Sequence, residues 1–551
     1  MLLNQVKTPT DNVLAGGAHL SGCRHPLKRR PISRFINKGP QLHKRPFHKI
    51  TGYVPTVAAS DVAQTTEPGV ENNKDPEEAF NWFKTWWPVN LVRNLENDRP
   101  NRIQLMGRWY VAWKGPSGNW NLMDDACPHR LAPLSEGRVE DDGTLLCAYH
   151  AWRFDEAGKC VKIPQADSEA AECTACDSRR SRVTKYPAKV VGGVLWLWPD
   201  ASESSLEESE AYPIPMREDL AQRADKYADL GVPLGYTRIL PYSCDVLLEN
   251  LADPAHLPVA HHAAFPFFNR YNAKSLDMKP VDAKVGPHIK EEHNLGSWDC
   301  LINGLPSRVT VAAPNYTEQV QELKELSTFS ATYSVPLEAG KCRVIFFQIS
   351  PRSDKPPPLA LKLFPWIPHL VTSTVFDSDT VFLNAQDRNL RVEAAKRGTD
   401  ATGGNKGGWR KFFLPTSSDL AIRAIREWMD SKGNGGPSFP SGQAMEMSDL
   451  SRQELQDRYE SHTKECKECQ RGLKLAETVV AAAQLAMILS FGGLCALFGS
   501  IGVKGIVSKL STALGGAGIL AVMVAAFFAR KAALELRQKF LFLDWVHADH
   551  D

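Results

Sequence analysis

Two short motifs in the first half of the chain each pair a cysteine with a histidine. In the first motif, one residue separates Cys127 from His129. The second motif begins after 17 intervening residues, and in it two residues separate Cys147 from His150. A [2Fe-2S] cluster of the Rieske type has two thiolates on one iron and two imidazoles on the other. Two loops must therefore each supply one cysteine and one histidine. We therefore predict that these four residues bind such a cluster. Structural zinc is the alternative, but zinc fingers usually place their histidines together on a helix.

A second candidate metal site begins at Asp253, with His256 and His261 following it. Two histidines five residues apart, near the end of a helix interrupted by prolines, can converge on one metal and leave its opposite face open. They would supply two of the three ligands of a 2-His-1-carboxylate iron site, whose vacant positions admit O2 and substrate. His262 is a possible substitute for His261. We predict that Asp253 orients a ligand imidazole and carries electrons from cluster to iron.

The third iron ligand must be a carboxylate that is distant in sequence. The segment Phe376-Asp377-Ser378-Asp379 supplies two candidates. We choose Asp379 as the ligand, and Asp377 stays open because spacing alone does not separate the two acids.

Two regions of different composition must position these sites. Residues 80–200 contain short apolar runs separated by Gly, Pro, Asn and Asp, which predicts an all-β domain around the cluster motifs. Residues 201–450 mix strand-like runs, such as 309–312 and 343–349, with helical patterns such as 245–251. This second region is predicted to be an α+β catalytic domain.

The N-terminus differs from the rest of the chain. Residues 1–58 hold ten Lys and Arg but one acid, Asp11, and lack the apolar stretch of a secretory signal. This composition predicts an organelle transit peptide, with a disordered basic tail as the alternative. Residues 59–79 are polar and acidic, which is typical of a solvated linker.

The C-terminal region contains two long uncharged stretches. No charged residue occurs over 26 positions between Glu477 and Lys504, or over 20 positions between Lys509 and Arg530. Such lengths match a bilayer core of about 30 Å, so residues 475–530 are predicted to form two transmembrane helices. A buried helical hairpin in a soluble protein is the alternative. Residues 531–551 form the tail.

A Cys-x-x-Cys motif precedes the predicted hairpin, within residues 451–474. Cys466 and Cys469 are close enough in sequence to form a disulfide or to be reduced by a thioredoxin, so redox regulation is one hypothesis. An unpaired couple of thiols is the other. Twelve cysteines in 551 residues are too sparse for a disulfide-stapled secreted protein, and a net charge of +2 gives no general attraction to nucleic acid.

The two metal motifs, in this order, resemble the Rieske oxygenase superfamily, in which a Rieske domain precedes a helix-grip catalytic domain. More narrowly, the chain is similar to the chloroplast branch that contains the pheophorbide a oxygenase family, its protochlorophyllide-linked and translocon-associated relatives, and chlorophyllide a oxygenase. The resemblance covers about residues 80–551, and these segments carry it: Cys127 to Gly137, Ile163 to Gln165, Leu248 to His256, His261-His262, and Cys466 to Cys469. It also implies that the third iron ligand is Asp379.

The resemblance implies a membrane-bound chloroplast oxygenase of chlorophyll catabolism, in the inner envelope or thylakoid. Its cofactors would be a [2Fe-2S] cluster and a mononuclear Fe(II), and its partners ferredoxin, O2, a chlorophyll-derived tetrapyrrole and possible thioredoxin. The His261-His262 pair and the tail segment 544–547 favour ring opening of pheophorbide a to red chlorophyll catabolite. Relatives commonly form trimers, so a homo-oligomer is expected.

Other functions remain open on the sequence alone. The chain is also consistent with a related monooxygenase that hydroxylates another chlorin or a bilin, with a translocon-associated redox sensor, or with an oxygenase of a small lipid or sterol. For the substrate pocket, we expect aromatic lining from residues 265–268 and 364–368.

Overall fold

The computed structural model describes the chain from residue 79 onward, with short gaps. The described ranges are 79–232, 234–264, 268–283, 285–322, 327–350, 358–398, 406–440, 449–499 and 506–550. The predicted transit peptide, nearly all of the predicted linker, residues 265–267 of the expected pocket and the turn of the hairpin lie outside them.

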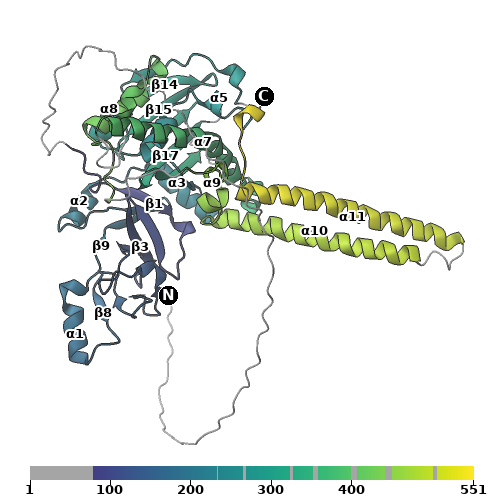
Figure 1. Ribbon diagram of the computed structural model, residues 1–551, viewed down its shortest axis with the longest axis horizontal. Coiled ribbons are helices and arrows are strands. Elements are labelled where there is room, and N and C mark those ends of the chain that lie inside the picture. The colour runs from purple at the N-terminus through teal and green to yellow at the C-terminus, as the bar shows by residue number, and fades with distance from the viewer. Residues whose placement is uncertain are drawn as a thin grey trace, which may run out of the picture. The chain divides into compact units, whose positions relative to one another are not determined.

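The cluster motifs lie in an all-β region, as predicted (Figure 1). In the described part of the chain this region has three antiparallel sheets, ordered β1-β11-β10, β2-β3-β4-β9 and β5-β6-β7-β8. Their strands are β1 (Trp87–Leu91), β2 (Asn101–Leu105), β3 (Arg108–Lys114), β4 (Trp120–Asp124), β5 (Arg138–Val139), β6 (Leu145–Leu146), β7 (Arg153–Phe154), β8 (Cys160–Lys162), β9 (Lys185–Tyr186), β10 (Ala188–Val191) and β11 (Val194–Leu197).

Local turn chemistry and aromatic burial explain this arrangement. Met106 and Gly107 both have positive φ, at 48° and 73°, so a two-residue turn joins β2 to β3 and matches the twist of the strands. The tryptophans that open the region, Trp86 and Trp87, are fully buried beside Trp196 of β11 in the same core. Such large side chains bury enough apolar surface to hold short strands together.

The catalytic region is built on one antiparallel sheet, which within the described ranges has seven strands in the order β12-β18-β17-β16-β15-β14-β13. The strands are β12 (Tyr236–Leu240), β13 (Lys279–Val281), β14 (Asn294–Ile302), β15 (Leu305–Ala312), β16 (Tyr316–Gln321), β17 (Thr328–Glu338) and β18 (Lys341–Ile349). Asn303-Gly304, with positive φ at both residues, forms the tight turn between β14 and β15. Together with its helices, this sheet confirms the predicted α+β class.

Helices of this region carry the candidate iron ligands or support them. The described helices are α1 (Glu169–Asp177), α2 (Ser205–Ala211), α3 (Glu218–Asp229), α4 (Cys244–Ala252), α5 (Leu257–Ala260), α6 (Leu359–Leu363), α7 (Ile367–Lys396), α8 (Leu420–Ser431) and α9 (Arg452–Leu455), of which α1 belongs to the Rieske region. Buried Arg426 of α8 holds α4 in place, because its Nη1 lies 2.5 Å from Asp245 Oδ2 and its Nε 2.5 Å from Glu249 Oε1. These charge-assisted bonds fix the helix that leads into the histidine pair.

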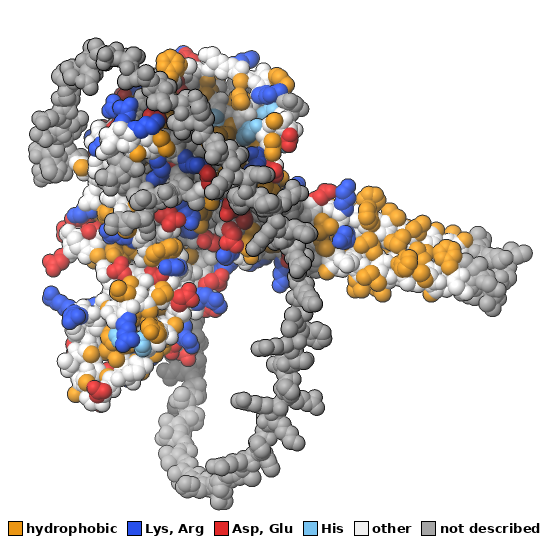
Figure 2. Space-filling model, in the orientation of Figure 1, with side chains coloured by type: hydrophobic (Ala, Val, Ile, Leu, Met, Phe, Trp, Pro, Cys, Tyr) orange, Lys and Arg blue, Asp and Glu red, His pale blue; other side chains and the backbone are white. Residues whose placement is uncertain are grey.

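Two long antiparallel helices close the chain, α10 (Lys467–Gly499) and α11 (Ile506–Leu541), and they lie side by side (Figure 1). The most apolar stretch of α10 has a mean hydropathy of 2.0, and 11% of it is buried. The corresponding values for α11 are 1.8 and 6%. On the face shown in Figure 2, hydrophobic side chains cover most of the hairpin, and charged ones gather where it meets the body. The helices extend beyond the predicted limits 475–530 at both ends. Length and exposure together suit a membrane span.

Candidate functional site

The two cluster motifs form loops with the same backbone hydrogen bonds. In the first loop the amide of Cys127 donates to the carbonyl of residue 132, and the amide of Leu131 donates back to the carbonyl of Cys127. In the second loop, Cys147 and Ala151 repeat this pattern, with residue 152 as the acceptor. Leu131 and Ala151 take φ values of 59° and 58°, the left-handed conformation that closes each loop. Each loop thereby holds its cysteine at a fixed position.

The side chains of the four predicted ligands converge. The rings of His129 and His150 lie 4.5 Å apart, and the thiols of Cys127 and Cys147, both buried, interact with each other. Trp152 stacks on His129 at 4.7 Å with an interplanar angle of 3° and shields one side of the site.

This arrangement fits a [2Fe-2S] cluster. His129 Nδ1 is buried and has no hydrogen-bond partner among the described residues, as expected of an atom kept for a metal. Burial, His150 and Arg130 lower the pKa of His129, which favours the neutral, ligating form. Burial raises the pKa of Cys127 to about 12, so the thiol needs a cation to become a thiolate ligand.

The predicted iron ligands come from three separate segments. His256 and His261 flank the short helix α5, and Asp379 lies near the middle of α7. Nε2 of His256 and Nε2 of His261 lie 4.0 Å and 3.7 Å from Asp379 Oδ2, so three possible ligand atoms face one point. Asp379 Oδ1 has no hydrogen-bond partner in the described chain. The donor set and its geometry fit a mononuclear iron site.

Ser378 orients one of these histidines, a role that the sequence did not reveal. Its Oγ lies 2.7 Å from Nδ1 of His261, and the Ser378 hydroxyl donates to the carbonyl of Val375 at 2.7 Å. Because that hydroxyl proton is already committed, Nδ1–H of His261 must be the donor in the first contact. The lone pair of His261 therefore sits on Nε2 and points toward Asp379.

Asp377, the alternative to Asp379, faces a different environment. Arg238 Nη1 lies 2.6 Å from its Oδ1, and Arg458 Nε lies 2.6 Å from its Oδ2. Both arginines and Asp377 are at most 2% exposed. The two guanidinium groups occupy the carboxylate of Asp377, which leaves Asp379 as the acid that faces the histidines.

The other two residues considered at this site also have defined positions. Asp253 Oδ2 lies 3.6 Å from His256 Nδ1, just beyond hydrogen-bond distance, and Asp253 Oδ1 accepts the backbone amide of Ala255 at 2.8 Å. His262 is not among the converging ligand atoms of the described chain, and its Nδ1 accepts the amide of Arg270 at 3.3 Å. Asn250, which was part of the motif without a predicted role, lies with Nδ2 3.3 Å from His256 Nε2.

Burial favours the uncharged forms of Asp379 and His261 in the metal-free protein, whereas for His256 burial is outweighed by the neighbouring carboxylates of Asp253 and Asp379, which raise the pKa. Burial raises the pKa of Asp379 to about 7, although His256 and Asn250 act in the opposite direction. Burial and the nearby His256 and His547 lower the pKa of His261 to about 3. A buried carboxyl and a neutral imidazole that face each other favour a bound cation, which stabilises the carboxylate form.

A cavity of about 790 Å³ opens onto the three candidate iron ligands. Its wall includes Thr317, Gln319 and Gln321, which alternate along β16 and so share one face of the sheet. Phe268 lines it as expected, but residues 364–368 do not belong to its described lining. Four residues of α7 contribute instead: Val371, Thr372, Val375 and Phe376. That part of the pocket prediction is wrong, because the first turn of α7 packs against the base of the hairpin, where Trp366 contacts Phe540.

Cys466 and Cys469 are free thiols at the start of α10, and both are buried. They lie in an apolar cluster with Trp366 and Phe540. Neither sulfur is open to a protein reductant in this conformation.

Comparisons with known proteins agree with this geometry. The family described as "Rieske [2Fe-2S] domain" matches residues 85–187, and "Pheophorbide a oxygenase" matches residues 306–396. This pair of domains defines a Rieske non-haem iron oxygenase, an enzyme class that uses a [2Fe-2S] cluster and a mononuclear iron. Pheophorbide a oxygenase, chloroplastic, from Oryza sativa subsp. japonica is 31% identical over 507 residues, which cover 88% of each protein. The chain therefore belongs to the pheophorbide a oxygenase family.

Other relatives have different names. Flavonoid 8-hydroxylase 2, chloroplastic, from Ocimum basilicum is 29% identical, and the match covers 85% of this chain and 89% of that protein. Among solved structures, dicamba monooxygenase bound to dicamba is 20% identical with a TM-score of 0.46, and the match covers 62% of this chain and 95% of that one.

Proposed function

We propose that the protein opens the macrocycle of pheophorbide a to give red chlorophyll catabolite, using O2 and electrons from reduced ferredoxin. The observation that carries this proposal is the cavity of about 790 Å³ beside His256, His261 and Asp379. Ligand pockets usually measure about 300–1,000 Å³, so this one is at the large end and suits a tetrapyrrole. The identity of 31% to pheophorbide a oxygenase over 88% of the chain supports the same substrate class.

The lining of the cavity suits a flat macrocycle with polar groups on its rim. Leu251, Leu257 and Phe268 provide apolar contacts near the iron ligands. Gln319 and Gln321 of β16 provide amide groups that can donate hydrogen bonds to carbonyl groups of the substrate. A few polar groups in a mainly apolar pocket fix the orientation of a large ligand.

The protein's own residues prepare the site for reaction. His256, His261 and Asp379 would hold ferrous iron, and Cys127, His129, Cys147 and His150 would hold the cluster. When bound, these centres supply one-electron storage and the activation of O2. Ser378 accepts a 2.7 Å hydrogen bond from the Nδ1–H of His261, so the lone pair on Nε2 is available to bind a metal. We propose Asp253, 3.6 Å from His256, as the residue that orients this imidazole and connects it to the electron donor.

The proposal also concerns partners and location. A cluster held by these four residues would store one electron, whereas activation of O2 needs two, so a homo-oligomer that shares electrons between subunits, or two successive donations from ferredoxin, would meet the requirement. The two exposed apolar helices suit an integral membrane protein, and the chloroplastic relatives suit the inner envelope or thylakoid.

The test is a turnover assay on the purified full chain with ferredoxin, its reductase and pheophorbide a under 18O2. We expect a ring-opened product that carries the isotope, identified by mass spectrometry, and O2 uptake coupled to its formation. Parallel reactions contain protochlorophyllide and a flavone. Isotope incorporation into either of these, with none into pheophorbide a, would refute the substrate assignment.

Adjacent histidines provide matched variants for this assay. His261→Gln should abolish turnover, because it removes an iron ligand. His262→Gln should retain most of it, because His262 bonds to the loop at Arg270 and not to the iron ligands. Equal loss in both variants would contradict the proposed ligand set.

A further inference from the structure

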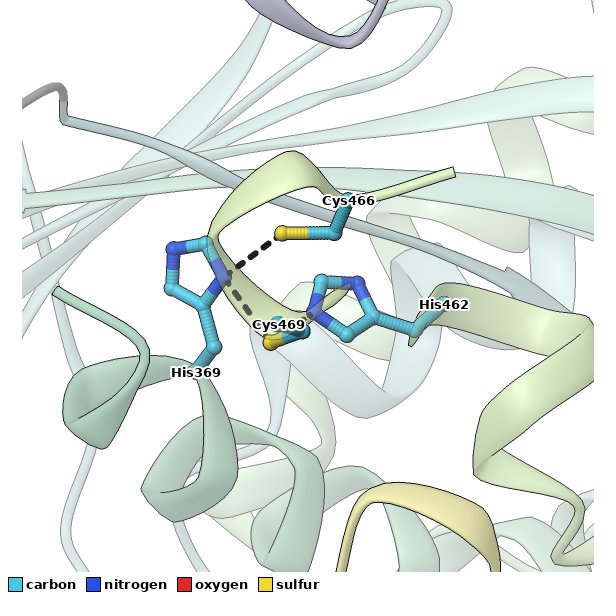
Figure 3. A group of neighbouring side chains, drawn as sticks. All are labelled: His369, His462, Cys466 and Cys469. Atoms are coloured by element: carbon cyan, nitrogen blue, oxygen red, sulfur yellow. Dashed lines mark hydrogen bonds between the residues drawn. The ribbon is translucent and has the colours of Figure 1, made fainter. Parts of the chain in front are cut away.

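A second cluster of metal-binding side chains lies outside the oxygenase site, where the hairpin joins the catalytic body. His369, His462, Cys466 and Cys469 converge there, and their ligand atoms all lie within 4.8 Å of one another. Figure 3 shows the two imidazole rings and two sulfur atoms facing a common point. The residues come from α7, from the π-helical turn at Tyr459–Thr463, and from the start of α10.

The distances match tetrahedral coordination. His369 Nδ1 lies 3.2 Å from Cys466 Sγ and 3.6 Å from Cys469 Sγ, and His462 Nε2 lies 3.2 Å from Cys469 Sγ. With Zn–S at about 2.3 Å and Zn–N at about 2.0–2.1 Å, tetrahedral geometry places sulfur and nitrogen ligands about 3.6 Å apart. These three sulfur–nitrogen distances therefore need to change by at most a few tenths of an ångström.

The tautomer of His462 is already the one that a metal requires. Its Nδ1 lies 2.6 Å from the carbonyl oxygen of Thr237, which can only accept, so Nδ1 carries the proton. The lone pair on Nε2 then faces the sulfur atoms. A ligand histidine held by a backbone carbonyl in this way is the usual outer-shell arrangement of zinc sites.

Burial and charge also favour a bound dication. All four side chains are at most 5% exposed, and Trp366 and Phe540 pack against the two cysteines. A zinc ion with two thiolates and two neutral imidazoles has no net charge, so it can occupy a dry pocket without the large cost of burying an unpaired ion. Glu468, whose carboxylate lies 3.4 Å from Cys466 Sγ, is neutralised by Arg93 Nε at 3.3 Å.

We propose that His369, His462, Cys466 and Cys469 bind a structural zinc ion that joins the hairpin to the catalytic body. Four protein ligands close the coordination shell, which distinguishes a structural site from a catalytic one. Binding displaces whatever protons the two cysteine sulfurs carry and forms two Zn–S and two Zn–N bonds, without any oxidant or reductant. Because His369 lies on α7, the helix that also carries Asp379, the ion would fix the base of the hairpin relative to the iron site.

This inference is independent of the substrate and is tested by metal analysis of the full chain, purified in detergent under reducing conditions without chelator. We expect one zinc per chain by plasma mass spectrometry, in addition to iron. Cys469→Ser should lose the zinc and keep its iron, and Cys173→Ser, which alters an exposed thiol outside the cluster, should keep both. Wild-type protein that remains free of zinc after incubation with Zn2+ would overturn the proposal.

A measurement on the wild-type chain avoids dependence on a variant that fails to fold. Protein loaded with Co2+ at this site should show thiolate-to-cobalt charge-transfer absorption, and two thiols should become reactive to a thiol reagent only after a strong chelator is added. A Cys466–Cys469 disulfide found by peptide mapping of anaerobically purified protein would refute the zinc site, since a disulfide leaves no thiolate for the metal.

Discussion

The carboxylate of Asp377 holds two buried arginines, and its removal should destabilise the catalytic region. Asp377→Asn keeps the size of the side chain but leaves Arg238 and Arg458 without their counter-ion at the 2.6 Å contacts. Their remaining partners are neutral acceptors, such as the Ser461 hydroxyl at 3.0 Å and the carbonyl of Lys539 at 2.8 Å. Breaking a buried ion pair in this way costs about 3–5 kcal/mol.

The expected effect is large enough to measure by thermal unfolding. For a domain of this size, 1 kcal/mol shifts Tm by about 2–4 °C, so Asp377→Asn should unfold about 6–20 °C below the wild type. Tryptophan fluorescence follows the transition in detergent, with all samples free of iron.

Asp379→Asn is the matched control, two residues away on the same helix. Among the described residues its carboxylate is ion-paired only with the two histidines, so the metal-free variant should unfold within about 1 kcal/mol of the wild type, while iron analysis should show loss of the mononuclear ion. The assignment of the two acids is wrong if Asp377→Asn unfolds at the same temperature as the wild type. It is also wrong if Asp377→Asn loses the iron and Asp379→Asn keeps it.

Three further variants test the two metal sites. Ser378→Ala removes the partner of His261 Nδ1 and should lower Fe(II) affinity about 10–100-fold, measured by competition with a chelator; unchanged affinity would contradict the orienting role. Cys147→Ser should eliminate the rhombic resonance of the reduced cluster while the mononuclear iron remains, and a persisting resonance would exclude this ligand. Gly137→Ala would place Cβ 2.1 Å from the carbonyl oxygen of Leu146 and should destabilise the first cluster loop by about 1–3 kcal/mol, read as faster cluster loss on heating.

Local spacing was sufficient to select four cluster-ligand candidates that converge in the fold, but not to select the whole candidate iron site. Cys127 to His150 are close in sequence, and the C-x-H and C-x-x-H patterns require nothing from the rest of the chain. Asp379 lies more than a hundred residues from His261, and spacing alone did not separate it from Asp377. The distinction depends on Arg238 and Arg458, which three-dimensional packing brings to Asp377.

Roles that depend on orientation also escaped prediction. Ser378 stands between the two acids in the sequence, but only the contact with His261 shows what it does. His369 lies 97 residues from Cys466, so the sequence left the Cys-x-x-Cys motif as either a redox pair or an unpaired couple of thiols and did not connect it to its histidines. The arrangement His462-x-x-x-Cys466-x-x-Cys469 was the available signal. The fold class was easier to predict than these roles, because strand alternation, turn residues and uncharged stretches are properties of short segments.

The repeated hydrogen-bond pattern of the two cluster loops has a consequence for electron exchange. In both loops two backbone amides, that of the cysteine and that of the residue four positions later, already donate hydrogen bonds within the loop, at N···O distances between 2.7 and 2.9 Å. Neither loop backbone is therefore free to shift easily. Loops held in this way would change little in shape when a bound cluster gains or loses an electron. The protein would therefore reorganise little at each transfer, which favours fast electron exchange.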